Sequence, residues 1–340
     1  MMILFLIQIN CLFKNMMKIS ICVPVYGVEK FIERCSRSIL EQDYFDLDII
    51  FVDDKSNDLS VSILKKIIND YPSRKEQVRI IRHSENKGLA EARNTAVANA
   101  KGDFLIHVDG DDYIDGNFIS SLVNEQKKRN FDIVFGSSKI IREGEIFKRV
   151  VPYDVSRQDL MINILSLKIP HNVWGVLIKT SLYRDYDIKN IVGINNTEDL
   201  QIIPKLIYHA KSFSSINNAF YFYDCSSNGE SYTNKPRISS STQSWITFEE
   251  LFRFFKNTNP LFLEALNRGL ALNIAMQMIR WSQYKEEYNY YDELVSKAKK
   301  VNYHTLFRLP IKYSMVLLLK KRFLINFIVL VSKKITHILK

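Results

Sequence analysis

Cysteine is scarce in this sequence, and none of the four residues is placed for metal binding or dithiol chemistry. Cys11, Cys22, Cys35 and Cys225 are irregularly spaced and form no C-x-x-C pair, the spacing that cysteine zinc sites and redox motifs use. Cys22 falls inside an apolar run and is expected to be a core residue. This usage fits a reducing compartment.

A long apolar run is also missing from the start of the chain. The first 17 residues, "MMILFLIQINCLFKNMM", are too short to span a bilayer, which takes roughly 20 residues. They lack the basic region and the A-x-A cleavage site of a secretory signal. Because "MKISICVPVYG" begins a domain cleanly at Met17, we predict that 1–17 is an extension upstream of the true start. A weak amphipathic anchor remains the alternative.

Acidic residues are absent after Glu293, and this absence explains the formal net charge of +10. The tail from 294 onward holds 11 of the 47 Lys and Arg residues and none of the 37 acids, so the rest of the chain is close to neutral. No recognised nucleic-acid motif accompanies the basic tail. The sequence therefore predicts no nucleic-acid partner.

The first half of the 340 residues alternates apolar runs with amphipathic segments. The runs predict strands, and the amphipathic segments predict helices. Such repeats of about 30 residues indicate an α/β fold with a mostly parallel sheet flanked by helices. The expected strands are 19–25, 47–53, 78–83 and 104–109, and the expected helices lie near 30–42, 59–71 and 89–101.

After Phe118 the pattern changes. A strand at 132–136 is followed by a hairpin turning at Glu143 and Gly144, helices near 156–168 and from Thr197, a strand at 219–224, and helices from about 240. We predict a catalytic domain at 18–225 and a helical C-terminal region with a basic amphipathic tail at 226–340.

Carboxylates crowd the expected carboxyl edge of the sheet. Asp109, Asp111 and Asp112 follow one strand, and Asp53 and Asp54 follow another. Such crowding is costly unless a cation or hydrogen-bond donors neutralise it. An Asp-x-Asp pair suits Mg²⁺ or Mn²⁺, which takes one or two protein carboxylates. A calcium loop fails on its ligand spacing, whereas turn and helix capping remains open and is the role assigned to Asp115.

Four segments in this order resemble the family 2 glycosyltransferases, which have the GT-A fold, a Rossmann-like sheet. They are "SICVPVYGVEKFIERCSRSILEQ", "DIIFVDDKSND", "NKGLAEARNTAVANAKGDFLIHVDGDD" and "NNTEDL". The resemblance covers about residues 18–225. It implies transfer of a sugar from a nucleotide donor, usually with inversion, using a divalent metal.

The resemblance assigns the metal to the Asp-x-Asp. Asp111 is similar to the family's metal ligand, and Asp109 lies where the family contacts the donor ribose and the metal. Asp112 extends the acidic turn. The implied cofactor is Mn²⁺ or Mg²⁺, which makes the departing nucleotide a better leaving group.

The resemblance also assigns the donor contacts. Asp54 matches the position that reads the nucleobase, with Asp53 beside it, and helix capping is the alternative, for which Asp58 is better placed. Pro24 and Tyr26 resemble the loop that packs on the base and ribose, although the family more often has Asn in place of Gly27.

Two further donor contacts lie in "NKGLAEARN". Gly88 is expected to let the backbone approach the ligand. Arg93 resembles the family's donor-contacting arginine, and a surface salt bridge is its alternative role.

The resemblance implies a general base in "NNTEDL". Asp199 is the expected base and Glu198 the second choice, although both residues could simply complement the dipole of a helix capped by Thr197. His171 and Trp174 resemble a segment on the acceptor side, and a core role for Trp174 is equally open.

The implied function is metal-dependent transfer of a sugar, from a UDP-sugar donor, to a glycan or lipid-linked acceptor in cell-surface polysaccharide synthesis. A catalytically silent sugar-binding or scaffold protein on the same fold is the alternative. In the tail, the apolar runs "MVLLL" and "FLINFIVLV" are separated by "KKR". They predict a helix lying on the inner face of the cell membrane, which makes the protein cytoplasmic and peripheral. Packing of the tail on the rest of the protein is the other possibility.

Overall fold

The structure is a computed structural model that describes residues 17–142, 145–149, 155–225, 238–282, 288–320 and 325. The chain divides into two compact units. The first contains Met1–Val155 and Asn172–Glu230, and the second contains Ser156–His171 and Ser231–Lys340.

A mixed sheet forms the centre of the first unit. Within the described residues it has nine strands in the order β3-β2-β1-β4-β8-β6-β9-β5, with β7 paired to β6. The strands are β1 (Ile19–Val25), β2 (Leu47–Asp53), β3 (Val78–Arg82), β4 (Phe104–His107), β5 (Tyr113–Ile114), β6 (Ile133–Arg142), β7 (Glu145–Arg149), β8 (Val176–Lys179) and β9 (Phe213–Asp224).

The four strands predicted from the first half are parallel neighbours, which confirms the α/β prediction. Strand β8 then runs antiparallel to both β4 and β6, and β9 lies parallel to β6 and antiparallel to β5. The sequence did not predict this mixed half of the sheet.

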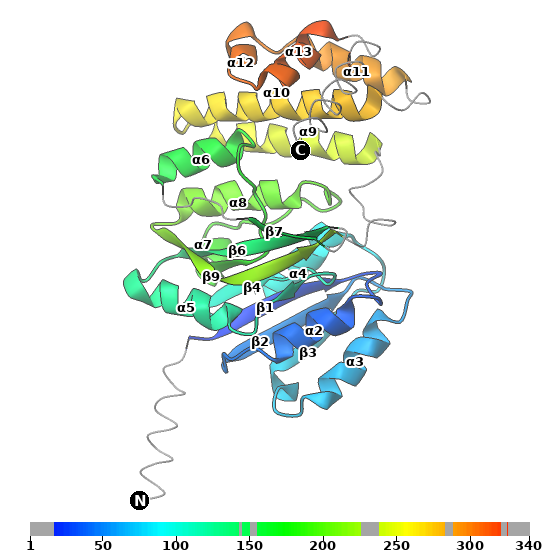
Figure 1. Ribbon diagram of the computed structural model, residues 1–340, viewed down its shortest axis with the longest axis vertical. Helices are drawn as coiled ribbons and strands as arrows, with labels where there is room; N and C mark the ends of the chain where they lie inside the picture. Colours follow the sequence, from blue (N-terminus) through cyan, green and yellow to red (C-terminus); the bar gives the residue numbers. More distant parts are fainter. Residues whose placement is uncertain are drawn as a thin grey trace, which may run out of the picture. The chain divides into compact units, whose positions relative to one another are not determined.

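Helices cover both faces of the parallel half. Helices α2 (Ile32–Leu40) and α3 (Ser60–Asp70) lie on one face, and α4 (Leu89–Asn99) lies on the other (Figure 1). Strands β1 and β2 are buried along nearly their whole length, because a parallel sheet covered on both faces exposes neither side of its strands. The unit also contains η1 (Lys75–Gln77), α5 (Phe118–Arg129), α7 (Thr180–Asp185) and α8 (Glu198–His209).

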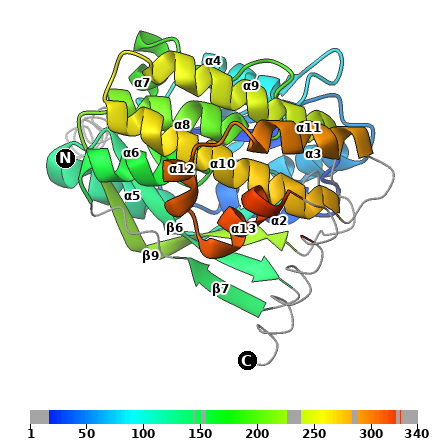
Figure 2. The same cartoon turned by 90° about the horizontal axis from the view of Figure 1, so that it is seen from above.

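The second unit is helical in its described residues, as predicted for the chain after about 240. Helices α9 and α10 run side by side in both views (Figures 1 and 2), and Trp281 and Met278 of α10 are buried in the unit's core. No helix among the described residues is both long and apolar enough to cross a membrane. The helices are α6 (Arg157–Leu165), α9 (Ile238–Phe255), α10 (Pro260–Ser282), α11 (Tyr288–Ala298), α12 (Tyr303–Phe307) and α13 (Ile311–Leu319).

The division of the chain differs from the expected boundary at 225 in one segment. Helix α6 was placed in the catalytic domain, but the structure assigns Ser156–His171 to the second unit. Its buried residues, which include Leu160 and Ile164, pack towards α10. A Cβ at Gly269 of α10 would collide with the carbonyl of Leu165, so this glycine permits the close approach.

Other expectations differ in detail or lie outside the described residues. Strand β9 begins at Phe213 instead of 219, and β4 ends at His107 instead of 109. Strands β6 and β7 pair antiparallel with Arg142 opposite Glu145, but the predicted turn residues Glu143 and Gly144 lie outside the described residues. So do 1–16, 321–324 and 326–340, which hold most of the predicted extension and much of the predicted tail.

Gly102 lies too close to neighbouring backbone to accommodate a side chain. A Cβ there would lie 2.5 Å from the backbone nitrogen of Ser20 and 2.6 Å from the carbonyl oxygen of Phe104. We expect Gly102→Ala to lower the free energy of unfolding by about 1–3 kcal/mol, since backbone atoms cannot move aside cheaply. Urea denaturation measures this change. Gly116→Ala is the control because its Cβ would meet nothing closer than 4.0 Å, and equal stability of the two variants would contradict the packing.

Candidate functional site

The acidic turn, Asp109–Asp112, follows β4 at the carboxyl edge of the parallel strands. It is closed by a hydrogen bond from the N–H of Asp112 to the carbonyl of Asp109, 3.0 Å. A Cβ at Gly110 would lie 2.9 Å from the carbonyl oxygen of Pro24. The glycine therefore lets the acidic turn pack against the end of β1.

Arg93 of α4 lies at the centre of the site and is only 2% exposed. Its Nη2 is 3.0 Å from Asp109 Oδ1 and 3.5 Å from Glu198 Oε1, and its Nη1 is 3.4 Å from Asp199 Oδ1. One guanidinium thus joins the acidic turn to the first residues of α8, about 90 positions later in the chain. The predicted residues Arg93, Asp109, Glu198 and Asp199 form one cluster, and the surface alternative for Arg93 is wrong.

Burial and mutual repulsion set the electrostatics of this cluster. Burial alone would lower the pKa of Arg93, but Asp109, Asp199 and Glu198 together raise it above its ordinary value. Burial raises the pKa of Glu198, and the neighbouring Asp199 adds to the rise. Burial also raises the pKa of Asp199, which Arg93 and the N–H of Val173 oppose. Both carboxyls therefore ionise less readily than exposed ones, and Arg93 opposes the rise in pKa for each of them.

The segment before α8 is tied to α4 by amide side chains. The side chain of Asn94 accepts the N–H of Asn190 at 2.8 Å and donates to its carbonyl at 3.0 Å. Asn195 Oδ1 accepts the N–H of Ala90 at 2.9 Å, within the first turn of α4. These bonds position Asp199 relative to Arg93.

Asp111, the second acid of the turn, is partly exposed. Its carbonyl accepts a hydrogen bond from Arg34 at 3.0 Å, but among the described residues no ion pair to its carboxylate is found. Burial, followed by repulsion from Asp109, raises the pKa of Asp111 to about 6. A carboxylate with this environment fits a divalent cation, because the cation would relieve the repulsion.

The described residues contain no group of three or more His, Cys, Asp and Glu side chains arranged to hold a metal. The expected pair fits this finding, since Asp111 and Asp109 are only two ligands and Mg²⁺ usually takes the rest from phosphate and water. Asp109 is the weaker candidate, because both of its oxygens accept from Arg93, at 3.0 and 3.3 Å.

The side chain of Asp112 connects the acidic turn to β9. It is fully buried. Its Oδ2 accepts the hydroxyl of Tyr221 at 2.6 Å, and its Oδ1 accepts the N–H of Asp224 at 2.9 Å. Both oxygens are therefore held by β9.

Asp53 and Asp54 are both buried at the end of β2. Asp53 pairs with Arg82 at 2.9 Å and accepts the N–H of Ser56 at 2.8 Å. The carboxylate of Asp54 accepts the N–H groups of Lys87 and Gly88 at 2.8 and 2.7 Å. Asp54 also contacts His83 Nδ1 at 2.7 Å. Asp54 therefore shapes the loop before α4, and its expected contact with the nucleobase stays a prediction.

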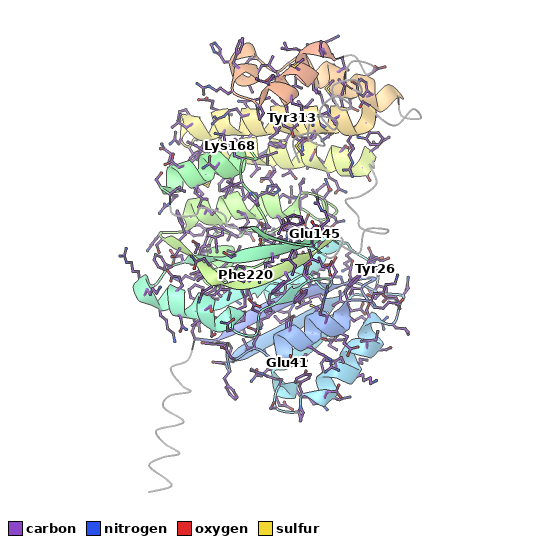
Figure 3. All side chains as sticks on the ribbon, in the orientation of Figure 1. Tyr26, Glu41, Glu145, Lys168, Phe220 and Tyr313 are labelled. Carbon is purple, nitrogen blue, oxygen red and sulfur yellow. The ribbon has the colours of Figure 1, made fainter. Side chains whose placement is uncertain are left out.

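Tyr26 is available for the role predicted for it. It follows β1 at the edge of the sheet (Figure 3), and it is 54% exposed, whereas Pro24 lies within the strand. Gly27 beside it has φ +66°, a conformation that Asn also tolerates, so the departure from the family's usual Asn suits this backbone.

Gly88 is needed for a reason that the sequence did not reveal. Its φ is +86°, and a Cβ there would lie 2.3 Å from the side chain of Asn195. The close approach is therefore made by a side chain of the protein itself, and the predicted approach of a ligand is not required to explain this glycine.

The two acceptor-side candidates fall in different units. Trp174 is 8% exposed in the core of the first unit and stacks on Tyr221, with ring centroids 4.4 Å apart. The structure thus favours the core role for Trp174. His171 is the last residue of the segment that belongs to the second unit, and its acceptor role stays a prediction.

Two capping expectations have opposite outcomes. Asp58 accepts the N–H of Ser60, the first residue of α3, at 3.1 Å, as expected for a cap. The capping role given to Asp115 is wrong, because its carboxylate accepts the N–H of Phe220 of β9 at 2.9 Å. Sequence reasoning also missed Asn195, Tyr221 and the N–H of Val173, since only the fold brings these groups to the site.

Comparison with known proteins agrees with this geometry. The model of glycosyl transferase family 2 matches residues 20–185. A poly(ribitol-phosphate) beta-glucosyltransferase of Bacillus spizizenii is 34% identical over 219 residues, which are 63% of this chain and 33% of that protein. The chain spans about a third of the length of the curated relatives that it matches first.

Solved structures share the fold. S. aureus TarS 1-349 in complex with UDP-GlcNAc has a TM-score of 0.71 at 19% identity, covering 94% of this chain and 92% of that one. A mannosyltransferase of Pyrobaculum calidifontis in complex with GDP-Man and Mn²⁺ has a TM-score of 0.54 at 15% identity, covering 89% and 86%. With the expected sheet in place and its motifs converging on Arg93, residues 20–185 form a domain of glycosyl transferase family 2, and the fold is GT-A.

Proposed function

We propose that the protein is a metal-dependent, inverting glycosyltransferase that moves a sugar from a UDP-sugar to a glycan or lipid-linked acceptor in cell-surface polysaccharide synthesis. The observation that carries the proposal is the buried cluster in which Arg93 holds Asp109 and Asp199 together. Buried charges are costly to maintain, and this cluster lies beside Asp111, a carboxylate suited to a cation.

The similar proteins support the donor and the acceptor class. TarS was solved with UDP-GlcNAc and with UDP, and the named relatives include enzymes that glycosylate poly(ribitol-phosphate). The mannosyltransferase with Mn²⁺ supports a divalent metal. The exposed ring of Tyr26 is a suitable surface for a base and ribose.

In this proposal Asp111, with Asp109, would hold a divalent cation. A bound cation would neutralise charge on the donor diphosphate and so improve the leaving group. The partial burial of Asp111 strengthens such an interaction, because water screens it less.

Asp199 is the proposed general base. It would take the proton from the acceptor hydroxyl as that oxygen attacks the anomeric carbon. The N–H of Val173 and the guanidinium of Arg93 favour its ionised form. Glu198 is less suited, because burial and the adjacent Asp199 favour its protonated form.

The alternative is a silent sugar-binding or scaffold protein on the same fold. Such a protein would bind a nucleotide sugar without needing a positioned base, so the retained Asp199 argues against it. Release of sugar from the donor distinguishes the two.

We further propose that the C-terminal region contacts the inner face of the membrane, where a lipid-linked acceptor would lie. Support comes from an apolar stripe on α12 and α13. Its members lie on one helical face of α13 and the end of α12, and they are exposed by 87%, 78%, 41% and 53%: Phe307, Ile311, Met315 and Leu318. Lys312 and Lys320 accompany the stripe, and each basic residue near an anionic surface contributes roughly 1 kcal/mol.

The packing alternative for the tail holds for part of it. Val316 and Leu317, on the opposite face of α13, are buried in the core of the second unit. Deleting the region from 310 would therefore damage that core, and substitution of exposed stripe residues is the cleaner experiment.

The metal assignment is tested with Asp111→Asn. We expect this variant to lose transfer and to lose the thermal stabilisation that UDP with Mn²⁺ gives the parent protein, because the cation loses a charged ligand. Asp70→Asn is the matched control, since it removes the same charge from α3. Unchanged metal-dependent UDP binding by Asp111→Asn would remove Asp111 from the metal site.

The base is tested by comparing Asp199→Asn with Glu198→Gln. Asp199→Asn should reduce turnover by about 10²-fold or more, while UDP binding with Mn²⁺ stays nearly intact. Glu198→Gln should keep most of the turnover, because burial and Asp199 favour the neutral form of this carboxyl, which an amide resembles. An inactive Glu198→Gln beside an active Asp199→Asn would exchange the two roles.

Membrane contact is tested with the double variant Phe307→Gln, Ile311→Gln. We expect its binding to phosphatidylglycerol vesicles at low salt to weaken at least about tenfold, because two apolar side chains no longer enter the headgroup region. Leu59→Gln with Ile146→Gln is the control on the first unit, where both side chains are also exposed. Failure of the parent protein to bind such vesicles would reject the proposal.

A further inference from the structure

Tyr221 of β9 contacts two parts of the site that are distant in sequence. It is completely buried. Its hydroxyl contacts the acidic turn, and its ring contacts the segment Val173–Gly175, which holds Asp199.

The hydroxyl of Tyr221 accepts one hydrogen bond and donates another. It accepts the backbone N–H of Asp109 at 3.0 Å and donates to Asp112 Oδ2 at 2.6 Å. A phenylalanine ring would fill the same space, so packing does not explain the hydroxyl. Both of its hydrogen bonds end on the acidic turn, and without them the partly buried N–H of Asp109 and a buried oxygen of Asp112 would each lose a partner.

The same strand holds the rest of the turn. The N–H of Asp224 donates to Asp112 Oδ1 at 2.9 Å, and the carboxylate of Asp224 pairs with Arg34 at 2.7 Å. Arg34 in turn donates to the carbonyl of Asp111 at 3.0 Å. Strand β9 thus fixes the backbone of the turn from Asp109 to Asp112, and among the described residues no hydrogen bond from β9 to the Asp111 carboxylate is found.

The ring of Tyr221 is fitted closely to the other segment. It stacks on Trp174 with an interplanar angle of 22°. Gly175 has φ +69°, and a Cβ added to it would lie 3.2 Å from the ring of Tyr221, which is closer than an ordinary van der Waals contact. The N–H of Gly175 donates to His107 of β4 at 3.1 Å. The residue before Trp174 is Val173, whose N–H donates to the Asp199 carboxylate.

We propose that Tyr221 is a positioning residue for the reaction: its hydroxyl holds the acidic turn in the conformation in which Asp111, with Asp109, would hold a divalent cation. This inference rests on the proposed function. Partners that orient metal ligands from behind typically affect metal affinity or activity by 10- to 100-fold. Tyr221 touches neither the cation nor the sugar, so its effect passes through the turn.

The test is Tyr221→Phe, with Tyr223→Phe as the matched control. Tyr223 lies two residues along the same strand and stacks on the same Trp174 at 5.4 Å, and no hydrogen bond from its hydroxyl to the acidic turn is found among the described residues. We expect Tyr221→Phe to raise the Mn²⁺ concentration for half-maximal activity by about tenfold or more. The same shift should appear in the Mn²⁺ dependence of UDP binding. Binding of UDP without metal should not change, and Tyr223→Phe should match the parent protein in all three measurements.

A merely structural role gives a different result. Loss of packing would lower the melting temperature and the fraction of active protein, but it would not move the Mn²⁺ midpoint of the molecules that remain folded. An unchanged midpoint in Tyr221→Phe would therefore overturn the inference. If that variant does not fold, Asp112→Asn probes the same hydrogen bond from its other end, and an unchanged midpoint there overturns the inference equally.

A parent protein that lacks the proposed function would give a third result. The parent protein would then show no Mn²⁺ dependence of either UDP binding or sugar transfer, and the inference would fall with it. A metal-dependent parent protein with a metal-insensitive Tyr221→Phe effect rejects only the role of Tyr221.

Discussion

The buried guanidinium of Arg93 is the constraint on which the site depends. A buried charge without partners costs several kcal/mol, so the chain must bring carboxylates to it. It does so from the acidic turn and from the start of α8, at Asp109, Glu198 and Asp199. Three carboxylates around one arginine leave an excess of negative charge. Burial makes that excess costly, which is why the pKa values of the three acids are raised together.

Hydrogen bonds to backbone groups surround this charged centre and keep its parts in place. Asp54 binds the backbone of Lys87 and Gly88 just before α4. Asn195 binds the first turn of that helix, and Asn94 binds the segment that leads to α8. Each bond joins elements distant in sequence, so the position of Arg93 is set by backbone contacts as well as by its ion pairs. Such support limits the reorganisation that a reaction at the site would require.

The sequence predicted the parallel half of the sheet and the identities of the clustered residues. It did not predict contacts between residues that only the tertiary fold brings together. Continuous apolar runs such as 47–53 predict buried parallel strands directly. The four-residue strand β8 carries no such pattern, and its antiparallel pairing was not foreseen. Helix α6 has an ordinary apolar face, which cannot indicate which unit will cover it. The roles expected of Arg93 and Asp199 came from the family resemblance, and their pairing was not predicted, because no local pattern links positions so far apart.

The aspartates after β4 can lie close together because most of their carboxylates have partners within the protein. Asp109 faces the guanidinium of Arg93, while Asp112 and Asp115 accept hydrogen bonds from β9. The protein compensates these three in part, although burial still raises the pKa values of Asp109 and Asp112. The carboxylate of Asp111 differs, since among the described residues it has no ion pair and its pKa is raised to about 6 by burial and by Asp109. Compensating three acids with internal donors fixes the turn and leaves the fourth carboxylate available for an external positive charge.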